Sequence, residues 1–304
     1  MITLKGKNIR MPVSCVLAMG KFESIHLGHQ ALIREMVRLA KGSNLASALL
    51  VFEPHPFRVL SDPGYKPLYT SRERAHLVAE LGVDYLLEYP FGTNFAGLSP
   101  FQFCRMIYED LQARFIIVGE GYRFGRERAG TADTLRQTAV QYNAQVYEVA
   151  HIGGAIKTST STIRALLSEN NLSQAERLLG CPFFIMGETA PGQRLGRTIG
   201  FPTINIYPPE EKFLPIDGVY ATRTFLDKRE YKGVTNIGVR PTVAGASAPR
   251  SVETYLLNFD NNVAGELYGK NIRTELLRFI RPEQRFENIE ALKIQIQKDC
   301  TNAT

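Results

Sequence analysis

The chain has 304 residues, of which 44% are hydrophobic and 22% charged, with a net charge of +6. These values suit two ordinary globular domains. No apolar run approaches the roughly 18–20 residues that a membrane-spanning helix needs. The apolar stretch Val13–Met19 is short and precedes a polar motif, so we expect no cleaved signal peptide. The charge is too mild to indicate nucleic-acid binding, and it fits an enzyme with small anionic substrates such as ATP.

Four cysteines lie far apart in the sequence, and no two form a CxxC pair: Cys15, Cys104, Cys181 and Cys300. This spacing argues against a zinc site or a disulfide framework. Unpaired cysteines suit a reducing compartment, so we expect a cytoplasmic protein.

Residues 14–180 alternate short apolar runs with amphipathic helical stretches. The runs 14–19, 46–52, 85–88 and 115–118 are typical of buried strands. Ser99-Pro100 predicts a helix start, with one apolar face made by Phe101, Cys104, Ile107, Tyr108 and Leu111. Alternation of strand and helix predicts an open, parallel α/β sheet, in which ligands bind at the carboxyl ends of the strands.

The pattern changes after a short predicted helix, 171–180, that ends in glycine and is followed by Cys181-Pro182. We place the domain boundary here, between domains 1–182 and 183–304. The second domain has closely spaced Pro and Gly around the β-rich runs 218–225, 251–259 and 272–279. This pattern predicts a small antiparallel β-barrel. A final helix is expected from Asn288, with Ile289, Leu292 and Ile296 on one face.

Two histidines follow the first predicted strand in the motif His26-Leu-Gly28-His29. They lie about one turn apart at a helix start, where unpaired N–H groups and a partial positive charge favour phosphate. Gly28 removes a side chain where the backbone must approach a ligand. Imidazoles at this place can stabilise charge that builds on phosphorus during transfer. The alternatives are a structural role for each histidine and a zinc site, which lacks a third ligand nearby.

Three further segments of the first domain are candidates for ligand contact. Ser159, Thr160 and Arg164 stand at a second helix start, where they suit phosphate, although Ser and Thr also cap helices without a ligand. The rigid turn 52–56, Phe-Glu-Pro-His-Pro, ends a strand at the ligand-binding edge. The loop 123–128 carries three arginines and is either a solvated loop or a second phosphate contact.

The stretch 187–205 contains glycines separated by three residues, at Gly192, Gly196 and Gly200. This spacing predicts a loop that packs closely on a ligand, with a turn-rich structural loop as the alternative. Thr203 and Asn205 would point to the same face of a strand. Their oxygens suit Mg²⁺ with its phosphates. No P-loop sequence is present.

The N-terminal motifs and the segment 118–125 (VGEGYRFG) resemble, in their sequence and in their order along the chain, the adenylyltransferase module of bacterial bifunctional FAD synthetases. The resemblance covers nearly the whole chain. It implies a nucleotidyltransferase-like α/β fold that moves AMP from ATP onto FMN and releases pyrophosphate. It also implies that Phe22 lies near the nucleotide and that the ATP phosphates meet His26, His29, Ser159, Thr160 and Arg164.

The sequence departs from this family at two places. The family usually has Phe-Asp-Gly where this chain has Phe22-Glu23-Ser24, and Asp or Asn where it has Gly121. A longer acid and a lost glycine predict a backbone displaced at the phosphate turn. A lost carboxylate or amide predicts one missing flavin or nucleotide contact. We therefore predict a weakened adenylyltransferase.

The stretch from Gly187 resembles the riboflavin kinase signature, a glycine loop followed by Gly-Phe-Pro-Thr-x-Asn, and downstream motifs agree in order. The resemblance implies transfer of the γ-phosphate of ATP to riboflavin. It implies that Thr203 and Asn205 bind Mg²⁺ and ATP phosphates, and that Glu253 is the general base on the 5′-hydroxyl of riboflavin. Alone, Glu253 is equally an exposed strand acid. The flavin contacts are expected at Arg281, Glu283 and Phe286.

The leading hypothesis is a bifunctional FAD synthetase that uses ATP, riboflavin and FMN. One alternative is a riboflavin kinase whose N-terminal module is inactive or repurposed. Another is a flavin-sensing or RNA-binding regulator built on this scaffold. The retained Pro-Thr-x-Asn motif and Glu253 argue against the regulator, because binding alone needs no base.

Overall fold

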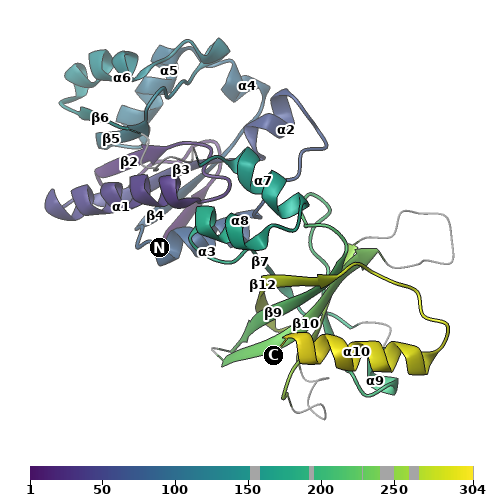
Figure 1. The fold of residues 1–304 in the computed structure, drawn as a ribbon. Coiled ribbons are helices and arrows are strands. Elements are labelled where there is room, and N and C mark those ends of the chain that lie inside the picture. The colour runs from purple at the N-terminus through teal and green to yellow at the C-terminus, as the bar shows by residue number, and fades with distance from the viewer. Residues whose placement is uncertain (151–157, 192–194, 228, 240–249, 260–266, 304) are drawn as a thin grey trace. The chain divides into compact units, whose positions relative to one another are not determined.

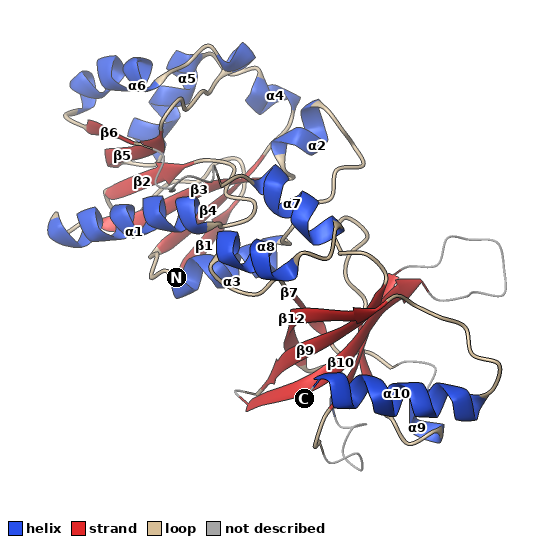
Figure 2. Ribbon diagram, viewed as in Figure 1, coloured by secondary structure: helices blue, strands red, loops and turns tan. Residues whose placement is uncertain are grey.

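The computed structural model describes residues 1–150, 158–191, 195–227, 229–239, 250–259 and 267–303. The chain forms two compact units, residues 1–159 and 160–304, and each contains one six-stranded sheet (Figures 1 and 2). In the described ranges, no helix has the length and apolar character needed to cross a membrane. The expected domain boundary at residue 182 stays a prediction.

The sheet of the first unit is parallel throughout, in the order β1-β4-β3-β2-β5-β6. Its central strands are buried on both faces, which explains their continuous apolar runs. The strands are β1 (Ile2–Lys5), β2 (Cys15–Met19), β3 (Ala46–Glu53), β4 (Tyr85–Pro90), β5 (Ala113–Gly119) and β6 (Gln145–Val149). The predicted nucleotidyltransferase-like α/β fold is confirmed.

Helices connect these strands, and α1 (Leu27–Gly42) packs against β2 and β3 through its apolar face. Figure 1 shows α1 running along the sheet. The other α-helices are α2 (Pro56–Leu60), α3 (Ser71–Glu80), α4 (Thr93–Ala96), α5 (Pro100–Arg105) and α6 (Ala132–Ala139). Two short 3₁₀ turns are η2 (Arg126–Arg128) and η3 (Val140–Tyr142).

The predicted helix start at Ser99-Pro100 is confirmed, because Ser99 caps α5 and Pro100 is its first residue. The apolar face is partly wrong, since the side chain of Phe101 is 59% exposed and Phe103 is buried. After α5 the chain continues as a π-helical turn, η1 (Met106–Asp110). A wider turn changes the angle between successive side chains, and a regular helical period does not anticipate it.

The sheet of the second unit is antiparallel and curled, in the order β7-β12-β9-β10-β11-β8. The two strands at the ends of this order approach each other, as a bridge between Ala190, just after β7, and Asn205 of β8 shows. A Cβ at Gly187 would lie 2.2 Å from Ile206 Cγ2, so only glycine permits this approach. The strands are β7 (Phe184–Glu188), β8 (Thr203–Ile206), β9 (Gly218–Leu226), β10 (Arg229–Val239), β11 (Arg250–Leu256) and β12 (Asn271–Arg281). The predicted small antiparallel β-barrel with a C-terminal helix is confirmed.

Buried threonines hold three strands of this sheet in register. The Thr235 hydroxyl lies 2.8 Å from that of Thr222 and 2.9 Å from that of Thr254, and all three side chains are buried. The hydroxyls satisfy one another across β9, β10 and β11. A shift of one strand by one residue would leave them buried and unpaired, which is costly.

The α-helices in the described part of the second unit are α7 (Thr160–Ser168), α8 (Leu172–Leu179), α9 (Leu195–Thr198) and α10 (Ile289–Ala303). The predicted last helix is confirmed, since Asn288 Oδ1 accepts a hydrogen bond from the N–H of Ala291. Ile289 is 55% exposed, so its expected place on the apolar face is wrong. Helix α8 packs on β12, and the Tyr220 hydroxyl contacts Asn170 Oδ1 at 3.2 Å.

This packing gives a prediction about fragments. We expect residues 160–304 to fold alone with a higher melting temperature than residues 183–304, because the shorter fragment exposes the face of β12 that α8 covers. Circular dichroism melts of both fragments measure the difference. Equal melting temperatures would show that α7 and α8 contribute nothing to the second unit.

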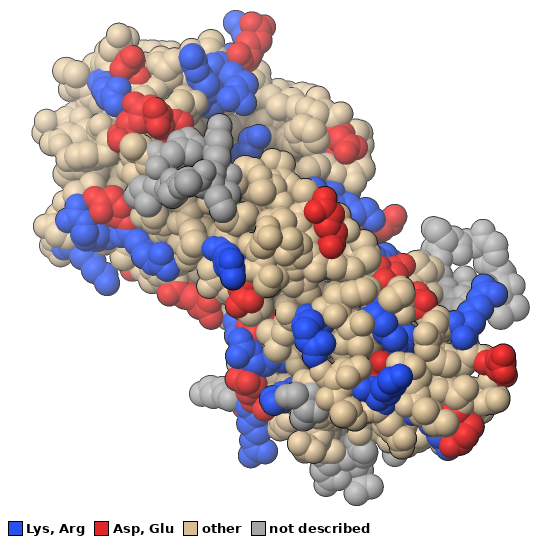
Figure 3. Space-filling model, in the orientation of Figure 1, with Lys and Arg blue, Asp and Glu red and all other residues tan. Residues whose placement is uncertain are grey.

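The charged side chains on the visible face of the molecule are mixed in sign. Lys and Arg are interspersed with Asp and Glu over both units (Figure 3). This distribution agrees with the mild net charge of +6.

Candidate active sites

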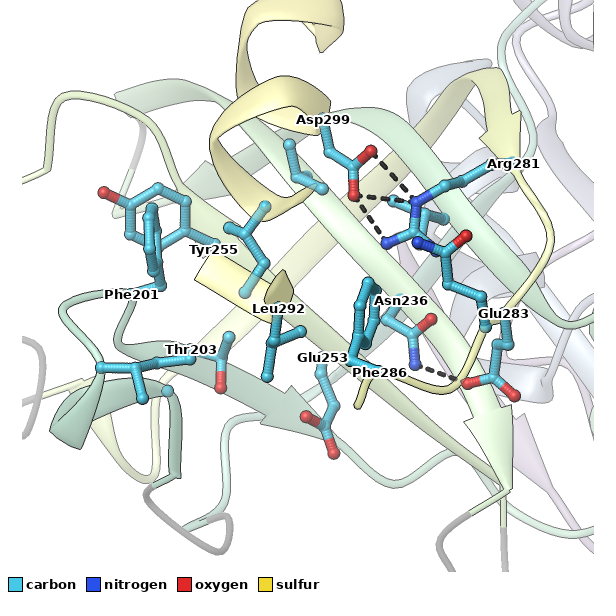
Figure 4. Close-up of a pocket in the computed structure, with 16 residues that line it drawn as sticks. Phe201, Thr203, Asn236, Glu253, Tyr255, Arg281, Glu283, Phe286, Leu292 and Asp299 are labelled. Atoms are coloured by element: carbon cyan, nitrogen blue, oxygen red, sulfur yellow. Dashed lines mark hydrogen bonds and ion pairs between the residues drawn. The ribbon is translucent and has the colours of Figure 1, made fainter. Parts of the chain in front are cut away.

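A row of polar side chains crosses the sheet of the second unit. Glu253 on β11 pairs with Asn205 on β8 and with Asn236 on β10. Residues directly opposite in antiparallel strands point to the same face. Glu253, Asn236 and Thr203 line a cavity of about 260 Å³, which Figure 4 shows from close by. The barrel therefore brings together the predicted base and both predicted metal ligands.

Asn205 has the burial expected of a ligand-binding residue. It is 1% exposed, and its Oδ1 has no hydrogen-bond partner among the residues that the structure describes. A buried acceptor without a partner costs free energy. A cation bound there would satisfy it, so this oxygen fits Mg²⁺.

Two polar pairs, drawn as dashed lines in Figure 4, fix the side chains of Arg281 and Glu283 in the wall of the cavity. Arg281 at the end of β12 donates from Nε and Nη2 to Asp299 of α10, with 2.7 Å between Nη2 and Oδ2. Asn236 Nδ2 donates to Glu283 Oε1 at 2.8 Å. A Cβ at Gly238 would lie 2.0 Å from that same oxygen, so glycine makes room for Glu283. The structure thus brings two predicted flavin contacts to the cavity and fixes both.

Phe286, the third predicted flavin contact, also lines this cavity. Its ring centroid lies 5.8 Å from the Arg281 guanidinium carbon. Leu292 and Ile296 of α10 complete the apolar part of the wall. Sequence reasoning missed Asp299, which is 1% exposed and holds Arg281 in place.

The glycine loop is described in part. Gly196 lies against the carbonyl of Phe201, since a Cβ there would be 2.3 Å from that oxygen. Gly200 has φ +90°, which favours glycine. The backbone of the chain itself therefore explains why glycine stands at both positions. A role for these glycines at the ATP phosphates stays a prediction. Gly192 lies outside the described residues.

In the first unit, the two histidines stack at the start of α1. The rings of His26 and His29 are 3.7 Å apart between centroids. His26 is the N-cap, and its Nδ1 accepts a hydrogen bond from the N–H of His29. Gly28 is the second residue of α1. The edge of Phe22 meets the His29 ring at 5.1 Å. The expected pairing of His26 and His29 at a helix start is confirmed.

His29 is neutral at physiological pH. Burial lowers the pKa of its imidazole well below the ordinary value, and the nearby His26 lowers it further. Its buried Nδ1 has no hydrogen-bond partner in the described part of the chain. A neutral, unpaired imidazole at a helix N-terminus is suited to bind a ligand.

The Ser/Thr run lies at the point of the sequence where the first unit ends and the second begins. Ser159 ends the first unit, and Thr160 begins α7 in the second. Arg164 of α7 lies over the ring of Phe213, with 4.8 Å from its guanidinium carbon to the centroid. The role of Ser159, Thr160 and Arg164 at ATP phosphates stays a prediction.

A larger cavity, of about 720 Å³, opens in the first unit, and its lining includes residues of the turn 52–56 and of the loop 123–128, two of the candidate segments for ligand contact. Its lining gathers residues that follow β3, β4 and β5, at the carboxyl edge of the sheet. Seven of the residues that line it are aromatic: Phe52, Phe57, Phe91, Phe95, Phe103, Tyr122 and Phe124. Gly121, three cations and one acid also line it, the charged residues being Lys21, Arg123, Arg128 and Glu127. The recurrence of aromatic residues just after each strand was the available sequence signal.

Comparison with known proteins agrees with this pair of sites. A riboflavin kinase family model matches residues 179–304, and an FAD synthetase family model matches residues 9–163. The bifunctional riboflavin kinase/FMN adenylyltransferase of Escherichia coli K12 is 37% identical over 289 residues, covering 94% of this chain and 90% of the relative. That of Listeria monocytogenes is 33% identical over 293 residues, with 94% and 90% covered.

The chain belongs to the bifunctional riboflavin kinase/FMN adenylyltransferase family. A solved structure described as a macrolide-efflux protein from Streptococcus pneumoniae is 26% identical. It covers 100% of this chain and 99% of its own, with a TM-score of 0.86. That likeness supports the two-unit fold, and the activity in its name is said of that protein. The chain therefore combines a riboflavin kinase and an FMN adenylyltransferase.

Proposed function

We propose that the second unit phosphorylates riboflavin to FMN and that the first unit adenylylates FMN to FAD with release of pyrophosphate. The observation that carries the kinase is the row Asn205–Glu253–Asn236 beside a cavity walled by Phe286, Leu292 and Ile296. One face of the barrel then offers an acid, a metal-suited oxygen and an apolar wall for a flavin ring.

In the kinase, Glu253 takes the proton of the riboflavin 5′-hydroxyl as that oxygen attacks the γ-phosphorus of ATP and ADP leaves. Thr203 and Asn205 would hold Mg²⁺ at the phosphates. When bound, this ion neutralises the charge that develops on the transferring phosphoryl group. The apolar wall and the fixed guanidinium of Arg281 orient the flavin so that its hydroxyl faces the acid.

In the adenylyltransferase, we assign the flavin of FMN to the aromatic cavity of the first unit. A planar ring stacks well on aromatic side chains. Lys21, Arg123 and Arg128 at the cavity provide positive charge for the phosphate of FMN. His26 and His29 stabilise charge on the α-phosphoryl group of ATP as the FMN phosphate attacks it and pyrophosphate leaves.

The proposal is tested by incubating the full chain with riboflavin, ATP and Mg²⁺ and separating the products by chromatography. We expect FMN first and FAD afterwards. FMN without FAD would favour the kinase-only alternative. The absence of both products would favour a binding protein without enzyme activity. The same assay without Mg²⁺ tests the metal assignment, because we expect FMN formation to stop.

Asp299 gives a second test of the kinase site. Replacing it by Asn removes the charge that holds Arg281, and a hydrogen bond to a charged group contributes about 1.5–3 kcal/mol. We expect the KM for riboflavin to rise by about tenfold or more, with a smaller change in kcat. Steady-state kinetics measures both. Glu290→Gln is the matched control, since Glu290 is a solvent-exposed acid on the same helix. Equal KM values for Asp299→Asn and the control would remove Arg281 from flavin binding.

A further inference from the structure

The turn between β2 and α1 has an unusual backbone. Phe22 has φ 42° and Ile25 has φ 45°. A left-handed conformation is strained for a bulky or β-branched residue. Such residues persist only where their surroundings determine the conformation. Phe22 and Ile25 are each 1% exposed, and a contact made by the residues between them can serve as a further anchor of the turn.

Glu23 supplies that anchor from inside the protein, at 3% exposure. The Tyr65 hydroxyl donates to Oε2 at 2.6 Å, and the N–H of Leu68 donates to Oε1 at 3.0 Å. His55 Nε2 lies 3.4 Å from Oε2. Both carboxylate oxygens are used, and each of these three contacts reaches a segment more than 30 residues away in the sequence.

The same turn determines where the two histidines lie. The carbonyl of Ile25 accepts a hydrogen bond from Gln30 Nε2 at 2.9 Å, and His26 follows directly as the cap of α1. On the other side, the ring of Phe22 meets His29. A shift of Glu23 therefore moves the turn and both imidazoles together.

The structure also changes how the departures at 23 and 24 are interpreted. The positive φ values lie at Phe22 and Ile25, and Ser24 is not among the residues with positive φ. In this chain the backbone at Ser24 therefore lies outside the left-handed region, and whether the turn is displaced stays a prediction. The longer side chain at 23 is held at both oxygens. Whether the adenylyltransferase is weakened stays a prediction.

We propose that Glu23 is a positioning residue for adenylyl transfer: it holds the strained turn so that His26 and His29 face the phosphates of ATP. This inference rests on the proposed adenylyltransferase function of the first unit. The charge on Glu23 acts through Tyr65, Leu68 and His55, and Glu23 itself touches no substrate. Shortening the acid is therefore more harmful than neutralising it.

The test compares Glu23→Gln, Glu23→Asp and Tyr65→Phe in the full chain. Gln keeps the length and one acceptor, so we expect kcat for FAD formation from FMN to fall by about tenfold. Asp cannot reach both Tyr65 and Leu68, so we expect a fall on the order of 10²-fold, as a displacement near 1 Å produces. Tyr65→Phe removes the hydroxyl that donates to Oε2 of Glu23, so we expect a fall in kcat similar to that of Glu23→Gln. The KM for ATP should change much less than kcat in all three variants.

Riboflavin phosphorylation by the second unit of the same molecule is the internal control, and it should be unchanged. Glu35→Gln is the matched control variant, because Glu35 lies on the exposed face of α1 and pairs with Arg38. Melting curves give the folded fraction, to which each rate is normalised. Normalised rates equal to wild type would show that Glu23 only stabilises the fold. Glu23→Asp as active as wild type, or more active, would overturn the proposal. Wild type that makes no FAD at all would overturn the proposed function with it.

Discussion

Glu253→Gln is expected to lower kcat for FMN formation by about 10²–10⁴-fold, because the amide keeps the size of the side chain and removes the general base. Glu253 lies between Asn205 and Asn236 in the polar row and lines the cavity. The KM for riboflavin should change little, since the apolar wall and Arg281 remain. Initial rates of FMN formation measure the effect.

Two controls make this result specific. Glu230→Gln changes an exposed acid of β10 in the same sheet and should leave the rate unchanged. FAD formation from added FMN should also be unchanged in Glu253→Gln. If the variant makes FMN at nearly the wild-type rate, Glu253 is not the base.

His29→Ala is expected to reduce FAD formation from FMN by at least about 10²-fold, the loss typical for removal of one group that stabilises transition-state charge. The imidazole is neutral, its Nδ1 has no partner among the described residues, and it stacks on His26. FMN formation from riboflavin should be unchanged. His76→Ala is the matched control, because His76 is a partly exposed histidine on α3. FAD formation at the wild-type rate by His29→Ala would place the chemistry elsewhere.

The same histidine predicts a pH dependence of stability. Its pKa in the folded chain is lowered by burial, so near the ordinary value of about 6.5 the unfolded chain binds a proton that the folded chain does not. The stabilisation is therefore complete above that pH and is lost as the pH falls below it. Urea unfolding at pH 7.5 and 5.5 should show a smaller pH effect in His29→Ala than in wild type. An equal pH effect in the two proteins would contradict the assignment of a neutral buried imidazole.

The sequence predicted the fold best where burial leaves a simple pattern. Strands such as β3 are largely apolar because both of their faces are buried. The edge strands β1 and β6 were missed, because their partly exposed residues interrupt the pattern. The exposed Phe101 was misplaced because the π-helical turn after Arg105 breaks the regular period. The threonine contacts across β9, β10 and β11 depend on register, which no local pattern contains.

The residues of the candidate sites also fall into two groups, those that a local motif predicts and those that the tertiary fold brings together. His26, His29, Thr203 and Asn205 belong to short motifs, so their pairing could be predicted from spacing alone. Asp299 meets Arg281 from 18 residues further along the chain, and the anchor of Glu23 comes from Tyr65 and Leu68. The aromatic cavity gathers residues from several loops. Contacts of this kind follow from the tertiary fold, and residue types alone do not reveal them.

Labelled ATP tests most directly whether one chain carries out both transfers, that of the γ-phosphoryl group to riboflavin and that of the adenylyl group to FMN. The full chain is given riboflavin and ATP labelled either at the γ-phosphate or at the α-phosphate. We predict that the γ-label enters FMN and is retained in FAD, whereas the α-label enters FAD alone. Label from the γ-position in FMN with no α-label in any flavin would contradict the adenylyltransferase. The absence of γ-label from FMN would contradict the kinase.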